Sequence, residues 1–208
     1  MALNSVSWAD QIVLVDAGST DNTAEIAVKY GAEVYSEPNR HNLNHNKNIA
    51  ISHCKGDWIF ILDADEKIPY DLAGEIRRIV NSDANAAGYL VPRRNFVMGR
   101  WVRRGSQFPD YQLRLFKRGK GVFPAKHVHE RLDVSGNISK LSLPFDHHPY
   151  PNFKMLVQKN LRYAEFEANY HFNLGKRING RGVLIQGLLR IPLRFFRRYV
   201  IKGGFLDG

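Results

Sequence analysis

The chain has 208 residues, a net charge of +10 and one cysteine. The single cysteine excludes a disulfide framework and fits a reducing compartment. No apolar run reaches the roughly 18 to 20 residues that a membrane-spanning helix needs. The length is sufficient for one domain with a sizeable core.

The first third of the chain predicts alternating strands and helices. Residues 11–16 form an apolar run that ends in Asp16, which predicts a buried strand. Gly18 permits a tight turn after it. We expect the helix that follows to reach about Tyr30, with Gly31 as the glycine that ends it.

Two more strands and a second helix follow. Residues 32–35 predict a short strand, and residues 44–54 predict a helix that carries Lys47 and Asn48. The apolar run at residues 57–62 predicts a strand that is buried on both faces. This order of elements is typical of an α/β fold with a mostly parallel sheet and helices on both faces.

Asp63 and Asp65 come directly after that last strand. We expect the strand that ends in Asp16 and the strand before Asp63 to be adjacent and parallel. Open α/β sheets bind ligands at the carboxyl ends of their strands, so Asp16, this pair and Lys47 should meet at one rim. Paired carboxylates suit Mg²⁺ or Mn²⁺. The rim would then bind a nucleotide diphosphate through a metal.

Helix capping is the alternative explanation for these carboxylates. Asp63, Asp65 and Glu66 could cap the helix that is expected after Pro69. The neighbouring strand that ends in Asp16 favours the ligand-binding interpretation.

Ordered motifs cover nearly the whole chain: residues 15–21, 47–48, 56–58, 62–66, 92–95, 99–101, 109–116 and 128–130. Together they resemble family 2 glycosyltransferases of the GT-A fold. The set is similar to the bacterial branch that adds glucose or a related sugar to the lipopolysaccharide inner core.

The resemblance implies roles on the donor side. It implies that Asp16 contacts a uracil base, that Asp63 contacts the ribose, and that Asp65 binds the metal. The donor is then a nucleotide sugar, with UDP as the expected nucleotide, and the cofactor is Mg²⁺ or Mn²⁺.

The resemblance also implies roles on the acceptor side. It places Asp110 at the position of the catalytic base and Gln112 and Arg114 near the acceptor. Glu130 is the reserve candidate for the base. Direct displacement at an anomeric carbon needs a carboxylate to take the proton of the acceptor hydroxyl. The alternative for Asp110 is a turn residue after Pro109.

The histidines leave several possibilities open. His129 could bind the metal or the diphosphate, since a neutral imidazole ligates metals readily, or it could be structural. His147 and His148 are weaker candidates, although the family pattern has a histidine near them.

The resemblance also indicates a chain that is truncated at both ends. Family members begin with a strand and a helix before the strand that starts here at Gln11, and they continue past the segment at 204–208. We expect residues 3–8 to be a remnant of that first helix.

Positive charge is concentrated near the C-terminus. Residues 168–206 contain no acidic residue and eight basic ones: Lys176, Arg177, Arg181, Arg190, Arg194, Arg197, Arg198 and Lys202. Residues 187–202 predict a basic amphipathic helix that lies on an anionic membrane surface. The alternatives are packing on the catalytic domain and, less favoured, nucleic-acid binding.

These patterns predict a GT-A catalytic domain at residues 1–150 and a helical, membrane-associating extension at residues 151–208. The expected activity is inverting, metal-dependent sugar transfer to a lipid-linked saccharide at the cytoplasmic face of the inner membrane. A sugar nucleotidyltransferase is the alternative enzyme, and a degenerate membrane-associated binding module is the alternative without catalysis. Nucleic acid is not an expected partner.

Overall fold

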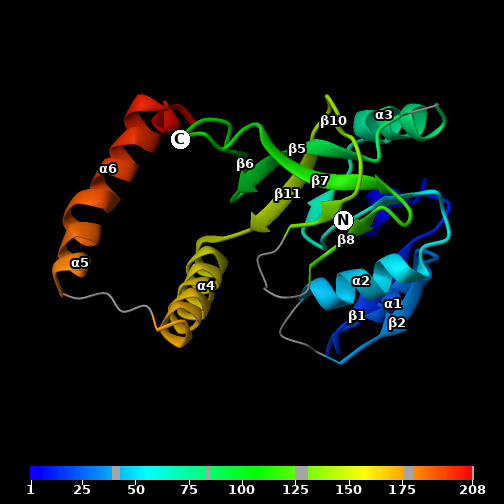
Figure 1. The fold of residues 1–208 in the computed structure, drawn as a ribbon, viewed down its shortest axis with the longest axis horizontal. Helices are drawn as coiled ribbons and strands as arrows, with labels where there is room; N and C mark the ends of the chain where they lie inside the picture. Colours follow the sequence, from blue (N-terminus) through cyan, green and yellow to red (C-terminus); the bar gives the residue numbers. More distant parts are fainter. Residues whose placement is uncertain (39–42, 83–84, 125–130, 176–179, 208) are drawn as a thin grey trace. The chain divides into compact units, whose positions relative to one another are not determined.

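The computed structural model describes residues 1–38, 43–82, 85–124, 131–175 and 180–207 (Figure 1). The chain forms two units. The first comprises Met1–Arg93 and Tyr111–Asp146, and the second comprises Arg94–Asp110 and His147–Gly208. The division at residue 150 that the sequence predicts stays a prediction.

The N-terminal part of the first unit has the predicted alternation. The short 3-10 helix η1 (Leu3–Val6) precedes β1 (Val13–Asp16), α1 (Thr23–Lys29), β2 (Glu33–Ser36) and α2 (Leu43–His53). β1 and β2 pair in parallel, with Asp16 opposite Ser36. Gly31 has a φ of +75°, so it ends α1 in the conformation that glycine adopts at low cost. α1 and α2 lie beside this pair of strands (Figure 1).

The remaining strands build a larger sheet whose path runs β3–β7–β5–β11–β4, with β6 and β10 pairing with β5. The helix α3 (Tyr70–Val80) follows β4, and β8 and β9 form a separate pair. The bounds of these strands are β3 (Trp58–Phe60), β4 (Glu66–Lys67), β5 (Gly88–Val97), β6 (Arg100–Trp101), β7 (Asp110–Lys117), β8 (Gly121–Val122), β9 (Asp133–Val134), β10 (Ile138–Lys140) and β11 (Phe145–Tyr150).

One expected strand pairing is wrong. β1 and β3 were expected to be adjacent parallel strands, but β1 pairs with β2, and β3 pairs antiparallel with β7. Ile59 lies opposite Phe116 in that pair. An apolar run shows that a strand is buried, but it does not specify the direction of the neighbouring strand, and the sequence offered no other evidence on that point.

Both faces of the large sheet are covered within the first unit, as the continuous apolar run predicted. One cluster of buried side chains joins Leu72 and Ile76 of α3 to Leu115 of β7. The other contains Ile59 of β3 and Phe116 of β7. Successive residues of a strand point to opposite faces, so the two clusters lie on opposite sides of the sheet.

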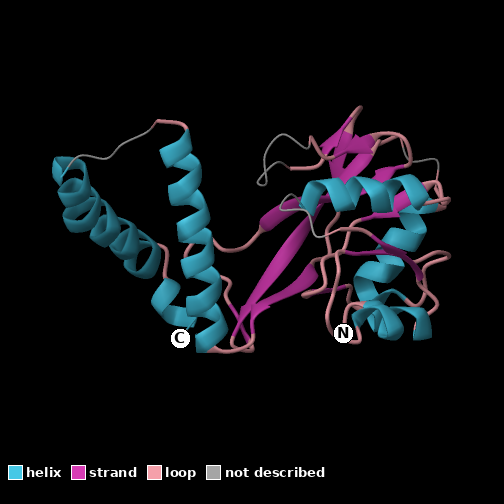
Figure 2. Ribbon diagram, turned by 90° about the horizontal axis from the view of Figure 1, so that it is seen from below, coloured by secondary structure: helices cyan, strands magenta, loops and turns pink. Residues whose placement is uncertain are grey.

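The second unit contains the C-terminal helices (Figure 2). α4 (Phe153–Asn173) begins at Asn152, whose side chain accepts a hydrogen bond from the Met155 N–H at 2.9 Å. Helical turns then run through α5 (Gly180–Ile185), η2 (Gln186–Arg190), α6 (Ile191–Phe196), η3 (Arg197–Ile201) and η4 (Gly204–Asp207). Pro192 lies in the first turn of α6, where its missing N–H costs little. No helix in the described part of the chain is long and apolar enough to cross a membrane.

The end of the second unit contacts the loop after β6. The Gly105 N–H donates to the Lys202 carbonyl at 3.1 Å, and the Arg104 N–H donates to the Asp207 carboxylate at 2.6 Å. Gly204 fits closely here, because a Cβ at this position would lie 2.8 Å from the Arg198 carbonyl oxygen. These contacts fix the C-terminal end of the helical run.

Candidate active site

Asp63 lies between β3 and β4 and is held by two cations. Its Oδ1 lies 2.7 Å from Lys47 Nζ of α2, and its Oδ2 lies 2.9 Å from Arg114 Nη2 of β7. Burial raises the pKa of Asp63, but the charges of Arg114 and Lys47 outweigh burial and bring the pKa below its usual value. The structure therefore presents an ionised carboxylate at the position where the sequence predicts ribose and metal contacts.

Glu66 also binds the guanidinium group of Arg114. Its side chain is 0% exposed, and its Oε1 accepts from Arg114 Nη2, while its Oε2 accepts the Asp63 N–H at 2.9 Å. Burial lowers the pKa of Arg114, but the negative charges of Glu66 and Asp63 outweigh burial and raise it. Glu66 thus fixes both the backbone of Asp63 and the cation that binds its side chain.

These partners correct the capping interpretation for two of the acidic residues. Asp63 and Glu66 bind Arg114, with Lys47 as a further partner of Asp63, so they are not simply caps of α3. Asp65 is half-buried in the turn between β3 and β4. No sequence pattern indicated that Glu66 would be a buried partner of Arg114, which lies 48 positions away along the chain.

Arg114 and Gln112 lie two residues apart on β7. The Arg114 side chain is 9% exposed and is directed to Asp63 and Glu66, whereas Gln112 is half-buried. The structure thus gives Arg114 a role in holding Asp63. The acceptor contacts that the resemblance implies for both residues stay predictions.

Lys47 and its neighbour Asn48 on α2 both contact Phe123. The Lys47 ammonium lies 5.4 Å from the centre of the Phe123 ring. Asn48 donates to the Phe123 carbonyl at 2.8 Å and accepts the Phe123 N–H at 2.9 Å. This reciprocal pair fixes the helix against the segment after β8, which holds Lys47 near Asp63.

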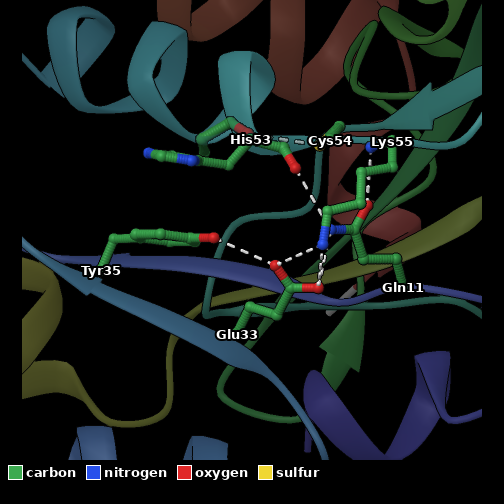
Figure 3. Close-up of polar contacts among 7 residues, drawn as sticks. Gln11, Glu33, Tyr35, His53, Cys54 and Lys55 are labelled. Carbon is green, nitrogen blue, oxygen red and sulfur yellow. Dashed lines mark hydrogen bonds and ion pairs between the residues drawn. The ribbon is translucent and has the colours of Figure 1, made fainter.

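A polar cluster fixes the end of α2 to β2 (Figure 3). The Glu33 carboxylate accepts hydrogen bonds from Gln11 at 3.0 Å, from Tyr35 at 3.0 Å and from Lys55 at 3.2 Å. Hydrogen bonds from Gln11, Lys55 and Tyr35 lower the pKa of Glu33. Gln11 also donates to the His53 carbonyl and accepts the Lys55 N–H. The Gln11 amide thus connects the segment just before β1 to the end of α2 and the turn that follows it.

Asp16 closes the turn that follows β1. Its carboxylate accepts hydrogen bonds from the backbone N–H and the hydroxyl of Ser19, across a turn in which Gly18 has a φ of +81°. Asp16 lies at the end of a strand in a different sheet from β3. Its contact with uracil stays a prediction.

The second unit contains Asp110, the first residue of β7. Its Oδ2 accepts a hydrogen bond from Asn95 Nδ2 at 3.2 Å. Asn95 Oδ1 in turn lies 2.7 Å from His147 Nδ1. The sequence singled out Asn95 only as part of a motif and treated His147 as a weak candidate, so neither was expected to be linked to Asp110.

Two predicted residues, His129 and Glu130, lie outside the described residues. The predicted metal set of Asp63, Asp65 and His129 is therefore only partly described. Within the ranges that the structure describes, no group of three or more His, Cys, Asp or Glu side chains is arranged to hold a metal. The ionised Asp63 carboxylate and the nearby Asp65 are nevertheless hard oxygen donors of the kind that bind Mg²⁺ with help from substrate phosphates.

The C-terminal turns expose large apolar side chains together with basic ones. Exposed side chains include those of Leu189, Leu193, Phe195, Phe196, Tyr199 and Val200. Arg190, Arg194, Arg197, Arg198 and Lys202 are also exposed. The stacked rings of Phe195 and Tyr199, with centres 5.0 Å apart, form part of this surface.

Relatives in bacteria point to one enzyme class. The lipopolysaccharide core biosynthesis glycosyltransferase LpsC of Rhizobium meliloti is 26% identical, over 97% of this chain and 75% of that protein. An uncharacterised glycosyltransferase of Rickettsia bellii is 30% identical, over 99% of this chain and 75% of that protein.

Solved structures show a similar fold. Staphylococcus aureus TarS 1–349 has a TM-score of 0.53 at 15% identity, over 71% of this chain and 56% of that one. Mannosyl-3-phosphoglycerate synthase from Rubrobacter xylanophilus has a TM-score of 0.50 at 17% identity, over 86% of this chain and 71% of that one. The predicted GT-A fold is thereby confirmed. Residues 3–132 match the family described as Glycosyl transferase family 2, and the chain is a member of that family of glycosyltransferases.

Proposed function

We propose that this glycosyltransferase moves a sugar from a UDP-linked donor to a lipid-linked saccharide, with inversion at the anomeric carbon. The observation that carries the proposal is the ionised Asp63 carboxylate, held by Lys47 and Arg114 at 2.7 and 2.9 Å. The similarity to a lipopolysaccharide core glycosyltransferase supports a lipopolysaccharide core as the acceptor.

On the donor side, Asp63 accepts hydrogen bonds from the ribose hydroxyls, and Asp16 contacts the uracil. Lys47 provides a positive charge for the diphosphate, because its side chain is 26% exposed and its ammonium lies beside Asp63. The buried Arg114–Glu66 pair keeps Asp63 in one orientation before the donor arrives, which reduces the ordering that binding requires.

Asp65 and Asp63 would hold a divalent cation, with His129 as the third predicted ligand. When bound, such a cation neutralises charge that develops on the departing diphosphate. The donor set fits, because carboxylates are the protein ligands that Mg²⁺ and Mn²⁺ prefer.

Asp110 acts as the base in this proposal. An acceptor hydroxyl oxygen forms its bond to the anomeric carbon while the bond from that carbon to the diphosphate oxygen breaks. The hydroxyl proton passes to the Asp110 carboxylate. Attack opposite to the leaving group inverts the anomeric configuration.

The basic surface of residues 187–202 lies on anionic lipid in the same proposal, at the cytoplasmic face of the inner membrane. Exposed Leu193 and Phe196 supply apolar contacts, while Arg194, Arg197 and Arg198 attract anionic headgroups. Docking of this kind would bring the enzyme to an acceptor that is itself anchored in the bilayer.

Family membership favours sugar transfer over the alternative of a sugar nucleotidyltransferase, and a product assay separates the two. The protein is incubated with UDP-glucose or another nucleotide sugar, with a deacylated lipopolysaccharide core and with Mn²⁺. Release of UDP that depends on the core, together with a new glycosidic linkage of inverted configuration by NMR, is expected. Formation of a nucleotide sugar from UTP and a sugar phosphate, without transfer to the core, would overturn the proposal.

A further inference from the structure

Three neighbouring strands place polar side chains in one hydrogen-bonded row. Asn95 of β5 donates to Asp110 of β7 at 3.2 Å, and its amide oxygen lies 2.7 Å from Nδ1 of His147 of β11. The sheet order β7–β5–β11 makes these three strands direct neighbours. We infer that Asn95 and His147 are positioning residues that fix the Asp110 carboxylate. This inference rests on the proposed role of Asp110 as the base.

The chemistry of the carboxylate determines how the Asn95 amide is oriented. An ionised carboxylate can only accept hydrogen bonds, so the amide nitrogen faces Asp110 and the amide oxygen faces His147. An amide oxygen also only accepts, so the hydrogen of the imidazole must be on Nδ1. The row therefore selects one tautomer of neutral His147, with its lone pair on Nε2.

Alternation along the strands separates His147 from the histidine beside it. His148 stacks on Phe96, with ring centres 4.6 Å apart and planes 14° apart. Successive residues of a strand point to opposite faces, so Asn95 and His147 share one face while Phe96 and His148 share the other. His148 is thus a matched control for His147. It is also a histidine, at the next position of the same strand, but its side chain points to the face opposite Asn95.

The row matters for catalysis because a base needs a fixed direction toward the hydroxyl that it deprotonates. The Asn95 hydrogen bond to Oδ2 restricts rotation of the Asp110 carboxylate, and His147 restricts rotation of the Asn95 amide. A displacement of about 1 Å in a reacting group can reduce the rate about a hundredfold. Asn95 and His147 act through Asp110 and need no contact with either substrate.

The tautomer of His147 provides a test that requires no substrate. Long-range ¹H–¹⁵N NMR spectra of the protein, recorded at alkaline pH so that the imidazoles are neutral, distinguish the two tautomers, and the His147→Asn variant assigns the signals. The expected result is the Nδ1–H tautomer in the wild type, with a shift toward the Nε2–H tautomer in Asn95→Ala. An Nε2–H tautomer in the wild type would overturn the inference.

Two substitutions of His147 test the same contact by kinetics in the UDP-release assay. An Asn amide nitrogen takes the place of Nδ1, whereas a Gln amide nitrogen reaches the place of Nε2. His147→Asn and the control His148→Asn should keep most of the turnover. His147→Gln and Asn95→Ala should lower kcat by about 10- to 100-fold with little change in the donor KM.

If His147→Gln keeps its turnover and His147→Asn loses it, Nε2 of His147 is the functional atom and the inference is overturned. Full turnover in Asn95→Ala would also overturn the inference, provided that Asp110→Asn is inactive. If Asp110→Asn is itself fully active, the proposed base is wrong, and the NMR result alone then decides whether the row fixes that carboxylate.

Discussion

Arg114 and Glu66 form a buried ion pair that also holds Asp63. The Glu66 side chain is 0% exposed, and the guanidinium group that it binds also lies 2.9 Å from the Asp63 carboxylate. Removing one partner of a buried pair leaves an uncompensated charge, which is costly, whereas the intact pair contributes little to net stability. The arrangement therefore serves to orient Asp63 more than to stabilise the fold.

Arg114→Met should destabilise the protein by about 3 to 5 kcal/mol, because it leaves Glu66 buried without its cation. The double variant Arg114→Met with Glu66→Leu should recover much of this loss, since the fully buried Glu66 charge is then removed together with its cation. Urea denaturation followed by circular dichroism measures both. If Arg114→Met is as stable as the wild type, other groups compensate the buried charge of Glu66.

The low pKa of Asp63 predicts a loss of stability in acid. Its folded-state pKa lies below the unfolded value, so its contribution is present above the unfolded pKa of about 3.9 and is lost as the pH falls through the folded value. Asp63→Asn removes that contribution, so the gap in unfolding free energy between the two proteins should narrow from pH 6 toward strongly acidic pH. A constant gap across this range would contradict the ionised, cation-bound state of Asp63.

Asp110→Asn should leave UDP binding intact and reduce turnover by about a hundredfold or more, as expected for a lost base. The substitution is nearly isosteric, so its effect should appear in kcat and not in the donor KM. Glu130→Gln is the comparison, because Glu130 is the other predicted base. Loss of transfer in Glu130→Gln together with most activity kept in Asp110→Asn would move the base assignment to Glu130.

Replacing Arg194, Arg197 and Arg198 by Gln should weaken co-sedimentation with anionic vesicles and leave neutral vesicles unaffected. Each basic residue near an anionic surface contributes about 1 kcal/mol, and salt screens that attraction. A matched control replaces three exposed lysines of the first unit, Lys29, Lys67 and Lys120, by Gln. Equal loss in the two triple variants would show that net charge, and not this surface, governs binding.

Local patterns in the sequence predicted the elements well but not their partners. The run before Asp63 correctly indicated a strand with both faces covered, and Gly31 correctly marked the end of α1. Neither pattern contains information about which strand lies alongside, and so the antiparallel pairing of β3 with β7 was missed.

The candidate site shows the same limit for side chains. The carboxylate Asp63 was identified from its position after a strand, but its partner Arg114 is 51 residues away and was assigned elsewhere. Asn95 and His147 are 52 residues apart and meet only because β5 and β11 are neighbours in the sheet. Long-range contacts of this kind depend on strand order, which one sequence does not specify.

Calorimetric titration with UDP tests the central claim, that the carboxylates after β3 bind a nucleotide diphosphate together with a metal. The wild type should bind UDP more tightly with Mn²⁺ than with EDTA. Asp65→Ala should lose that difference, and Asp57→Ala should keep it, because the Asp57 side chain is a nearby carboxylate that is 96% exposed. UDP binding that is the same with and without metal, and unchanged by Asp65→Ala, would contradict the account.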